Sequence, residues 1–201
     1  MDGIKIDIDV RNSVKKLSSH LTAIQKQQLP FATARALTWT VKKMQTDMIA
    51  AMPSIFKIRR KWYLPSVATG IRIQPAKKSA LFARLYTNAY FAGLQEHGGT
   101  KRPHRSAALL IPTDKTPQSR RIAGGARAML SQAKVFATPR GIYRRIGNKR
   151  DRRVELLYWR SQTAHITPRF GFADRADQSA RSHFNFFFNK SLAQALATAR
   201  R

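Results

Sequence analysis

The sequence predicts an α+β protein, in which a small antiparallel β-sheet is flanked by N-terminal helices and a long C-terminal helix, with a long basic loop or arm. Three observations predict this class. Residues 4–10 alternate apolar and charged side chains, which is the period of a strand with one face in water. Residues 30–52 and 174–196 carry apolar side chains at helical steps of three and four. Runs of β-prone residues separated by turn residues lie between these helices.

The N-terminal strand is followed by two predicted helices. Asn12 or Ser13 can cap the first helix, and Pro30 suits the first turn of the second. We interpret their apolar positions as stripes that face the core, formed by Val14, Leu17, Leu21 and Ile24 in the first helix and by Phe31, Ala34, Leu37, Val41, Met44 and Met48 in the second.

Residues 55–65, "IFKIRRKWYLP", place three aromatic residues among Lys and Arg. Phe56, Trp62 and Tyr63 can stack on nucleic-acid bases or line a groove that binds phosphate. The same rings can instead pin a connecting segment to the core while the charged groups stay in water. The second interpretation is favoured.

The middle of the chain is predicted to form strands and one long irregular segment. Residues 67–75 and 80–89 predict two strands joined by the basic tip "AKKS". A short strand, "ALLIP", lies within a stretch rich in Pro, Gly, Ser and Arg. Residues 113–134 have little periodicity, so we expect a mobile arm or insertion there until a partner orders it.

The last third of the chain predicts a basic hairpin and a long helix. Residues 141–160 form two β-prone runs around "NKRD". After "TPRFGF", Asp174 can cap a helix whose apolar positions are Ala176, Ala180, Phe184, Phe187, Phe188, Leu192 and Leu196. The side chains of three consecutive Phe residues, 186–188, cannot share one face of a helix, because successive residues turn by about 100°. At least one of them must therefore point away from the core or lie under another element, and we predict that Phe186 forms a subunit contact.

Composition narrows the possible partners. The 201 residues suit a single domain over residues 1–201, and the 38 Lys and Arg against 10 Asp and Glu give a formal net charge of +28. Such self-repulsion requires a polyanion, an acidic protein surface or an assembly to offset it. There is no cysteine, which excludes disulfides and thiolate metal sites. No apolar run approaches the roughly 20 residues of a spanning helix, so no membrane partner is expected.

Catalytic and metal-binding patterns are sparse. The chain has two glutamates, Glu96 and Glu155, so a carboxylate pair would need Asp residues from distant segments. Its five histidines show no zinc-binding spacing, and its glycine pairs lack the spacing of a phosphate loop. We expect no enzymatic activity, no cofactor and no metal site. No named nucleic-acid-binding module is present either.

Several segments resemble one family in matching order. "GIYRRIG" and "RRVELLYWRSQTAHITPRFGF", with the helix that follows, resemble the C-terminal half of phage tail-completion proteins, the minor tail protein Z group of long-tailed phages. "FKIRRKW" resembles a basic segment of the same group. "YFAGLQEHGGTKRP" resembles the wider head–tail joining family, in which Glu-x-Gly precedes a basic turn containing Pro.

The resemblance implies a structural virion protein of the tail or neck, assembled in the host cytoplasm. It implies a ring of identical subunits, hexameric in this group, that completes the head-proximal end of the tail and takes part in head–tail joining. Neighbouring tail terminator, tail tube or neck proteins and the phage genome end would be its partners. The alternative is a sequence-independent nucleic-acid-binding protein that uses dispersed Lys and Arg.

The candidate contact residues are the basic side chains of the hairpin and the arm. We expect them to face DNA or an acidic neighbouring ring, although a solvated hairpin tip that only aids solubility would carry the same residues. They are Arg120, Arg121, Arg144, Arg145, Lys149, Arg150, Arg152 and Arg153.

Overall fold

The computed structural model describes residues 3–18, 23–56, 58, 60–104, 106–121, 125–147 and 151–198, and it confirms the α+β class. The chain folds as two compact units in place of the single domain that was predicted. Unit 1 comprises residues 1–98 and 167–201, and unit 2 comprises residues 99–166. Unit 2 is therefore an insertion in the sequence of unit 1, and each unit has its own buried cluster of apolar side chains.

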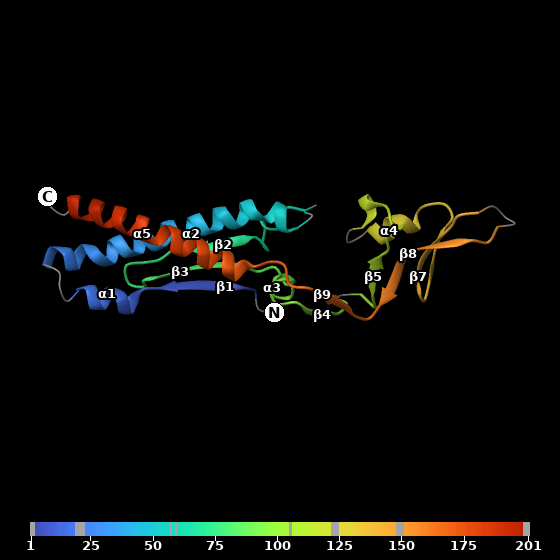
Figure 1. The fold of residues 1–201 in the computed structure, drawn as a ribbon, viewed down its shortest axis with the longest axis horizontal. Coiled ribbons are helices and arrows are strands. Elements are labelled where there is room, and N and C mark those ends of the chain that lie inside the picture. The colour runs from blue at the N-terminus through green and yellow to red at the C-terminus, as the bar shows by residue number, and fades with distance from the viewer. Residues whose placement is uncertain are drawn as a thin grey trace. The chain divides into compact units, whose positions relative to one another are not determined.

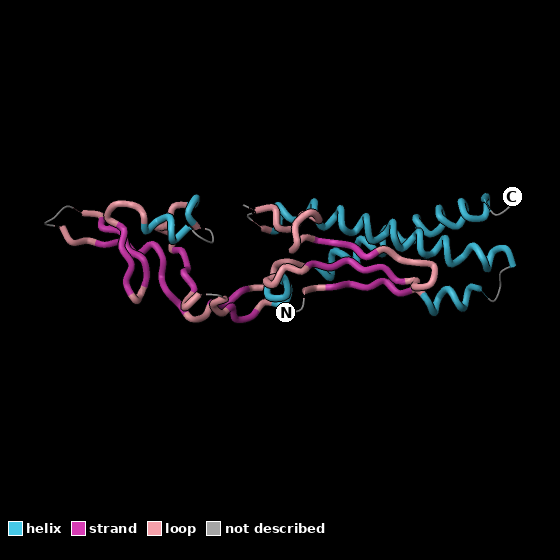
Figure 2. Tube along the Cα trace, turned by 180° about the vertical axis from the view of Figure 1, so that it is seen from behind, coloured by secondary structure: helices cyan, strands magenta, loops and turns pink. Residues whose placement is uncertain are grey.

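Unit 1 is a three-stranded antiparallel sheet packed against long helices (Figure 2). The strand order is β1-β3-β2, and Leu85 of β3 lies between Ile6 of β1 and Ile73 of β2. This confirms the N-terminal strand and the hairpin predicted from residues 67–89. The elements are β1 (Lys5–Asp9), α1 (Arg11–Ser18), α2 (Ala23–Ile55), β2 (Ile71–Gln74), β3 (Phe82–Thr87), α3 (Ala92–His97) and α5 (Phe172–Thr198).

Helix α2 is longer than predicted and is buried on more than one side. Pro30 lies inside the helix and not in its first turn, at the cost of one backbone hydrogen bond. Burial of Leu29, Ala32 and Thr33 around this proline supports the helix there. The predicted stripe is buried from Ala34 to Met48, and only Phe31 is partly exposed.

Helix α5 runs antiparallel to α2 (Figure 1). Its buried positions include the small residues Ser179, Ser191 and Ala195, which allow close approach, whereas Leu192 and Leu196 of the predicted stripe are half-buried. The Ser179 hydroxyl donates a 2.7 Å hydrogen bond to the Asp47 carboxylate of α2. Burial acts to raise the pKa of Asp47, but the hydrogen bonds from Lys43 and Ser179 outweigh it and hold this pKa below its usual value.

Unit 2 contains a four-stranded antiparallel sheet in the order β5-β8-β7-β6, and the predicted hairpin is its β7–β8 pair. A cluster around Met129, Leu157 and Tyr158 forms its core. The elements, drawn in green to orange in Figure 1, are β4 (Gly99–Lys101), β5 (Leu109–Pro112), η1 (Gln118–Arg120), α4 (Gly125–Leu130), β6 (Val135–Thr138), β7 (Gly141–Arg145), β8 (Val154–Ser161) and β9 (Ala164–Ile166).

The predicted arm, residues 113–134, contributes to the core of unit 2. Thr116, Ala126 and Met129 are buried, and the Thr113 hydroxyl donates to the carbonyl of Leu156 at 2.7 Å. The described part of the segment, residues 113–121 and 125–134, therefore packs against the sheet and is not a free arm. Its elements are three to six residues long, too short to show a period in the sequence.

The chain leaves unit 1 and returns to it at adjacent points. Strands β4 and β9 are paired, with Gly99 opposite Ile166. Gly98 and Gly99 have φ angles of 73° and 124°, where only glycine is free of strain, which explains the "HGG" sequence at this junction.

Glu96 of α3 caps α5 across this junction. Its carboxylate oxygens accept hydrogen bonds from the backbone N–H groups of Phe172, at 2.7 Å, and Ala173, at 2.9 Å. These are donors of the first turn, which have no partner within the helix. The predicted cap, Asp174, lies in that first turn and is exposed. Asp174 is not needed as a cap, because Glu96, 76 positions before Phe172, supplies the acceptor.

We expect Glu96→Ala to lower the free energy of unfolding by about 1–2 kcal/mol, because two helix donors lose a charged acceptor. The matched control is Asp174→Ala, which removes an exposed acid from the same helix end and should cost about 0.3–1 kcal/mol through the helix dipole. Urea unfolding followed by circular dichroism gives both values. A larger loss for Asp174→Ala than for Glu96→Ala would contradict the assignment of the cap.

Candidate functional site

Unit 2 is the most unevenly charged part of the chain. Residues 99–166 contain sixteen Lys and Arg against three acids, Asp114, Asp151 and Glu155. Self-repulsion among cations at this density favours binding of an anionic partner. Some of these cations are paired with acids of the same unit.

The end of the β7–β8 hairpin brings four of the predicted residues together. Arg145 is opposite Val154 in the ladder, and the N–H of Ile146 donates to the carbonyl of Arg153 at 3.1 Å. The side chains gathered there are Arg144, Arg145, Arg152 and Arg153, and we call this group the hairpin cluster. Lys149 and Arg150 lie outside the described residues.

Two members of the hairpin cluster are paired with acids. Arg144 contacts Glu155 at 2.5 Å, and Arg153 contacts Asp151 at 2.7 Å. The hydrogen bond from Arg153 holds the pKa of Asp151 below its usual value. Arg145 and Arg152 are exposed and form no ion pair with an acid among the described residues. These two side chains therefore present uncompensated charge to solvent.

Arg120 and Arg121 belong to a different part of unit 2. The Tyr158 hydroxyl donates to the Arg120 carbonyl, and the Arg121 guanidinium donates to the carbonyls of Thr116, at 2.8 Å, and Asp114. These contacts hold the loop before α4 against the sheet. Arg121 thus has a structural role that the sequence did not predict.

Three aromatic residues of unit 2 were not predicted from the sequence as site residues. Phe136, Tyr143 and Trp159 lie on neighbouring strands of the four-stranded sheet, and the Arg145 guanidinium lies 5.5 Å from the centre of the Phe136 ring. The signal that points to them is an aromatic residue in each of three consecutive β-prone runs, close to paired basic residues.

Phe186 belongs to unit 1 and is the exposed member of the three consecutive Phe residues, whereas Phe187 and Phe188 are half-buried. Its side chain is 61% exposed, and its ring contacts Phe187 at 5.4 Å. Phe187 stacks on Trp39 of α2 at 6.1 Å, and Lys190 lies over Phe186. A hollow of about 260 Å³ adjoins these rings. An apolar, partly cationic surface therefore spans α2 and α5.

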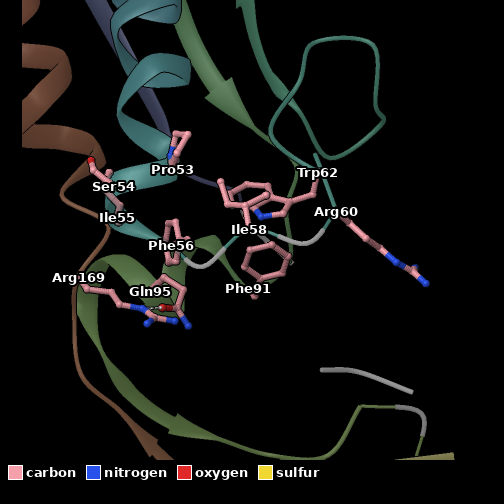
Figure 3. A pocket seen from close by; sticks show the side chains of 10 residues that line it. All are labelled: Pro53, Ser54, Ile55, Phe56, Ile58, Arg60, Trp62, Phe91, Gln95 and Arg169. Carbon is pink, nitrogen blue, oxygen red and sulfur yellow. Dashed lines mark hydrogen bonds between the residues drawn. The ribbon is translucent and has the colours of Figure 1, made fainter. Parts of the chain in front are cut away.

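A second hollow, of about 710 Å³, opens at the C-terminal end of α2 (Figure 3). The Arg169 guanidinium lies 4.9 Å from the Phe56 ring and donates to the Gln95 side chain at 2.8 Å. Trp62 packs edge-on against Phe91 at 4.8 Å, whereas Arg60 points away from the rings.

These contacts favour the pinning interpretation of residues 55–65. Phe56 and Trp62 pack against the core of unit 1, and Tyr63 is buried in it. The rings of this segment are therefore occupied by neighbouring aromatic side chains. They hold the connection from α2 to β2, while the exposed Arg60 and Lys61 remain in solvent.

Comparisons of the chain with protein-family models, curated proteins and solved structures gave no match. Within the described ranges, no three His, Asp or Glu side chains converge as a metal site would require. No helix in the described part of the chain has the length and apolar character to cross a membrane.

Proposed function

We propose that the protein is a structural subunit of a phage virion, which completes the head-proximal end of the tail and takes part in head–tail joining. The observation that carries the proposal is the unbalanced positive charge of unit 2, with Arg145 and Arg152 of the hairpin cluster left without acidic partners among the described residues. In a ring, symmetry would multiply this cluster into a collar of charge around a channel. Such a collar suits DNA or an acidic neighbouring ring.

The exposed aromatic surface of unit 1 supports assembly from identical subunits. Phe186, Phe187 and Trp39 form a continuous group of rings on α2 and α5. Large aromatic side chains are enriched in the buried centres of protein interfaces. We propose Phe186 as the centre of the contact between neighbouring subunits of the ring, which the family resemblance implies is a hexamer.

The second candidate function is sequence-independent binding of nucleic acid by a protein that is not part of a virion. The distribution of charge favours it, because the cations are spread over loops and strands and are not gathered on one recognition helix. Dispersed cations contact phosphates without reading sequence. Assembly into rings on tails separates the first candidate from the second.

We expect the affinity for duplex DNA to fall linearly with the logarithm of salt concentration, because binding releases condensed counterions. The double variant Arg145→Ala/Arg152→Ala should lose about 0.9 in slope for each phosphate contact removed. The matched control is Lys61→Ala/Lys77→Ala, which removes the same charge from exposed positions of unit 1. Filter binding over a salt series measures all three proteins.

Equal slopes for the two double variants would show that the hairpin cluster makes no special contact with DNA. Absence of binding at low salt would exclude the DNA-facing arrangement and leave an acidic protein ring as the partner of unit 2.

We expect Phe186→Asp to prevent ring formation, because it places a charge at the centre of an apolar contact. Leu130→Asp is the control, since it adds the same charge at an exposed apolar position of unit 2. Sedimentation gives the oligomeric state, and electron microscopy of tails shows whether the protein occupies their head-proximal end. Normal rings from a folded Phe186→Asp protein would refute the interface. A wild-type protein that never forms rings or joins tails would refute the proposed function.

A further inference from the structure

The four-stranded sheet of unit 2 has one covered face and one open face. Ile142, Tyr158 and Val135 point toward α4 and pack with Ala126 and Met129. The opposite side carries side chains that alternate with these along the strands and are half-buried or exposed. We call this side the outer face, and its residues are Ile111, Phe136, Tyr143, Arg145, Val154, Leu156 and Trp159.

A β-bulge brings Trp159 to the outer face. The register of β7 and β8 shifts between Ile142, which is opposite Tyr158, and Tyr143, which is opposite Leu156. Leu157 is thus an extra residue, and it and Tyr158 are both buried. A bulge of this kind reverses the alternation of the strand beyond it. Without it, Trp159 would share the covered face with Leu157.

The rings of the outer face are arranged as a platform. Phe136 and Tyr143 are opposite each other on β6 and β7 and stack at 6.0 Å with an interplanar angle of 21°. Trp159 is opposite Gly141, which has no side chain to cover the indole, and the Trp159 side chain is 48% exposed. A Cβ at Gly141 would lie 2.2 Å from the Tyr158 carbonyl oxygen, so no larger residue fits there.

Cations border this platform at both ends of the strands. Arg145 lies over Phe136 where β7 ends, close to the exposed Arg152. Arg140 is exposed in the turn before β7, at the other end of the strands, and its carbonyl accepts a hydrogen bond from the N–H of Arg160 at 2.9 Å. Arg160 follows Trp159 in β8, so its side chain alternates to the opposite face. The outer face therefore combines apolar rings in its middle with positive charge at its edges.

We propose that the outer face of unit 2 binds single-stranded nucleic acid, with bases stacked on Trp159 and Tyr143 and with phosphates bound by the flanking arginines. Unpaired bases expose their π faces, and stacking on aromatic side chains is sequence-tolerant. A duplex keeps its bases stacked on one another and offers the platform only phosphates. The positive charge at the edges of this face favours a polyanion as the ligand. The exposed rings favour a polyanion that carries unpaired bases, because these can stack on the rings. The inference does not depend on the role in tails.

Fluorescence anisotropy with labelled oligothymidylate and oligouridylate tests this inference on the full-length protein. We expect Trp159→Ala to weaken binding of the oligonucleotide by about 5- to 100-fold, the cost of one lost base stack. Trp159→Phe should retain most of the affinity, because it keeps a ring. The control is Tyr90→Ala, which removes an exposed aromatic side chain, at 59%, from unit 1 and should leave binding unchanged.

Inorganic polyphosphate separates stacking from charge, because it has the charged chain without bases. Its binding should change by less than about twofold in Trp159→Ala. Equal oligonucleotide affinity of Trp159→Ala and wild type, or an equal loss for both ligands, would overturn the proposal. A self-association of the wild type that Trp159→Ala abolishes would overturn it too, by making a second copy the occupant of the face. The two oligonucleotides distinguish DNA from RNA as the source of the strand. Oligonucleotide binding by a protein that never joins tails would support this inference while refuting the proposed function.

Discussion

The hydrogen bonds from the N–H groups of Phe172 and Ala173 to the carboxylate of Glu96 tie together two parts of unit 1 that the whole of unit 2 separates in sequence. The neighbouring residue, Gln95, accepts hydrogen bonds from the N–H groups of Arg169 and Phe170 at 2.9 and 3.0 Å. Helix α3, which contains Gln95 and Glu96, therefore fixes the position at which α5 begins. The packing of α5 along α2, the contact between Ser179 and Asp47, and the outward position of Phe186 all depend on that starting point.

Much of unit 1 could be predicted from the sequence, because its strands and long helices repeat their periods several times. The alternation in β1 and the stripe from Ala34 to Met48 are examples. Strands β4, β6 and β9 were not predicted, since three or four residues hold no period and their pairing partners are distant or unknown in advance. The cap of α5 escaped prediction for a related reason. Capping rules look for an acceptor next to the helix, and here tertiary structure supplies one from another element.

The candidate site was only partly predictable. Charge can be counted in a sequence, so the basic character of residues 139–153 was plain, but the pairing of each arginine was not. Arg144 and Arg145 are consecutive, yet one contacts Glu155 and the other lies over an aromatic ring on the opposite face. The position of Trp159 depends on the bulge at Leu157, and simple alternation along β8 assigns it to the wrong face. A one-residue irregularity thus decides which side chains the sheet offers to a partner.

The pairing of Gly99 with Ile166 has a further consequence for how such a chain can evolve. Both ends of residues 99–166 are neighbours in one ladder. A single recombination event can therefore replace this whole segment without changing the path of the backbone in unit 1. Lineages can in this way retain the helical scaffold of unit 1 while they replace the strongly cationic module wholesale, and the two parts are then free to diverge at different rates.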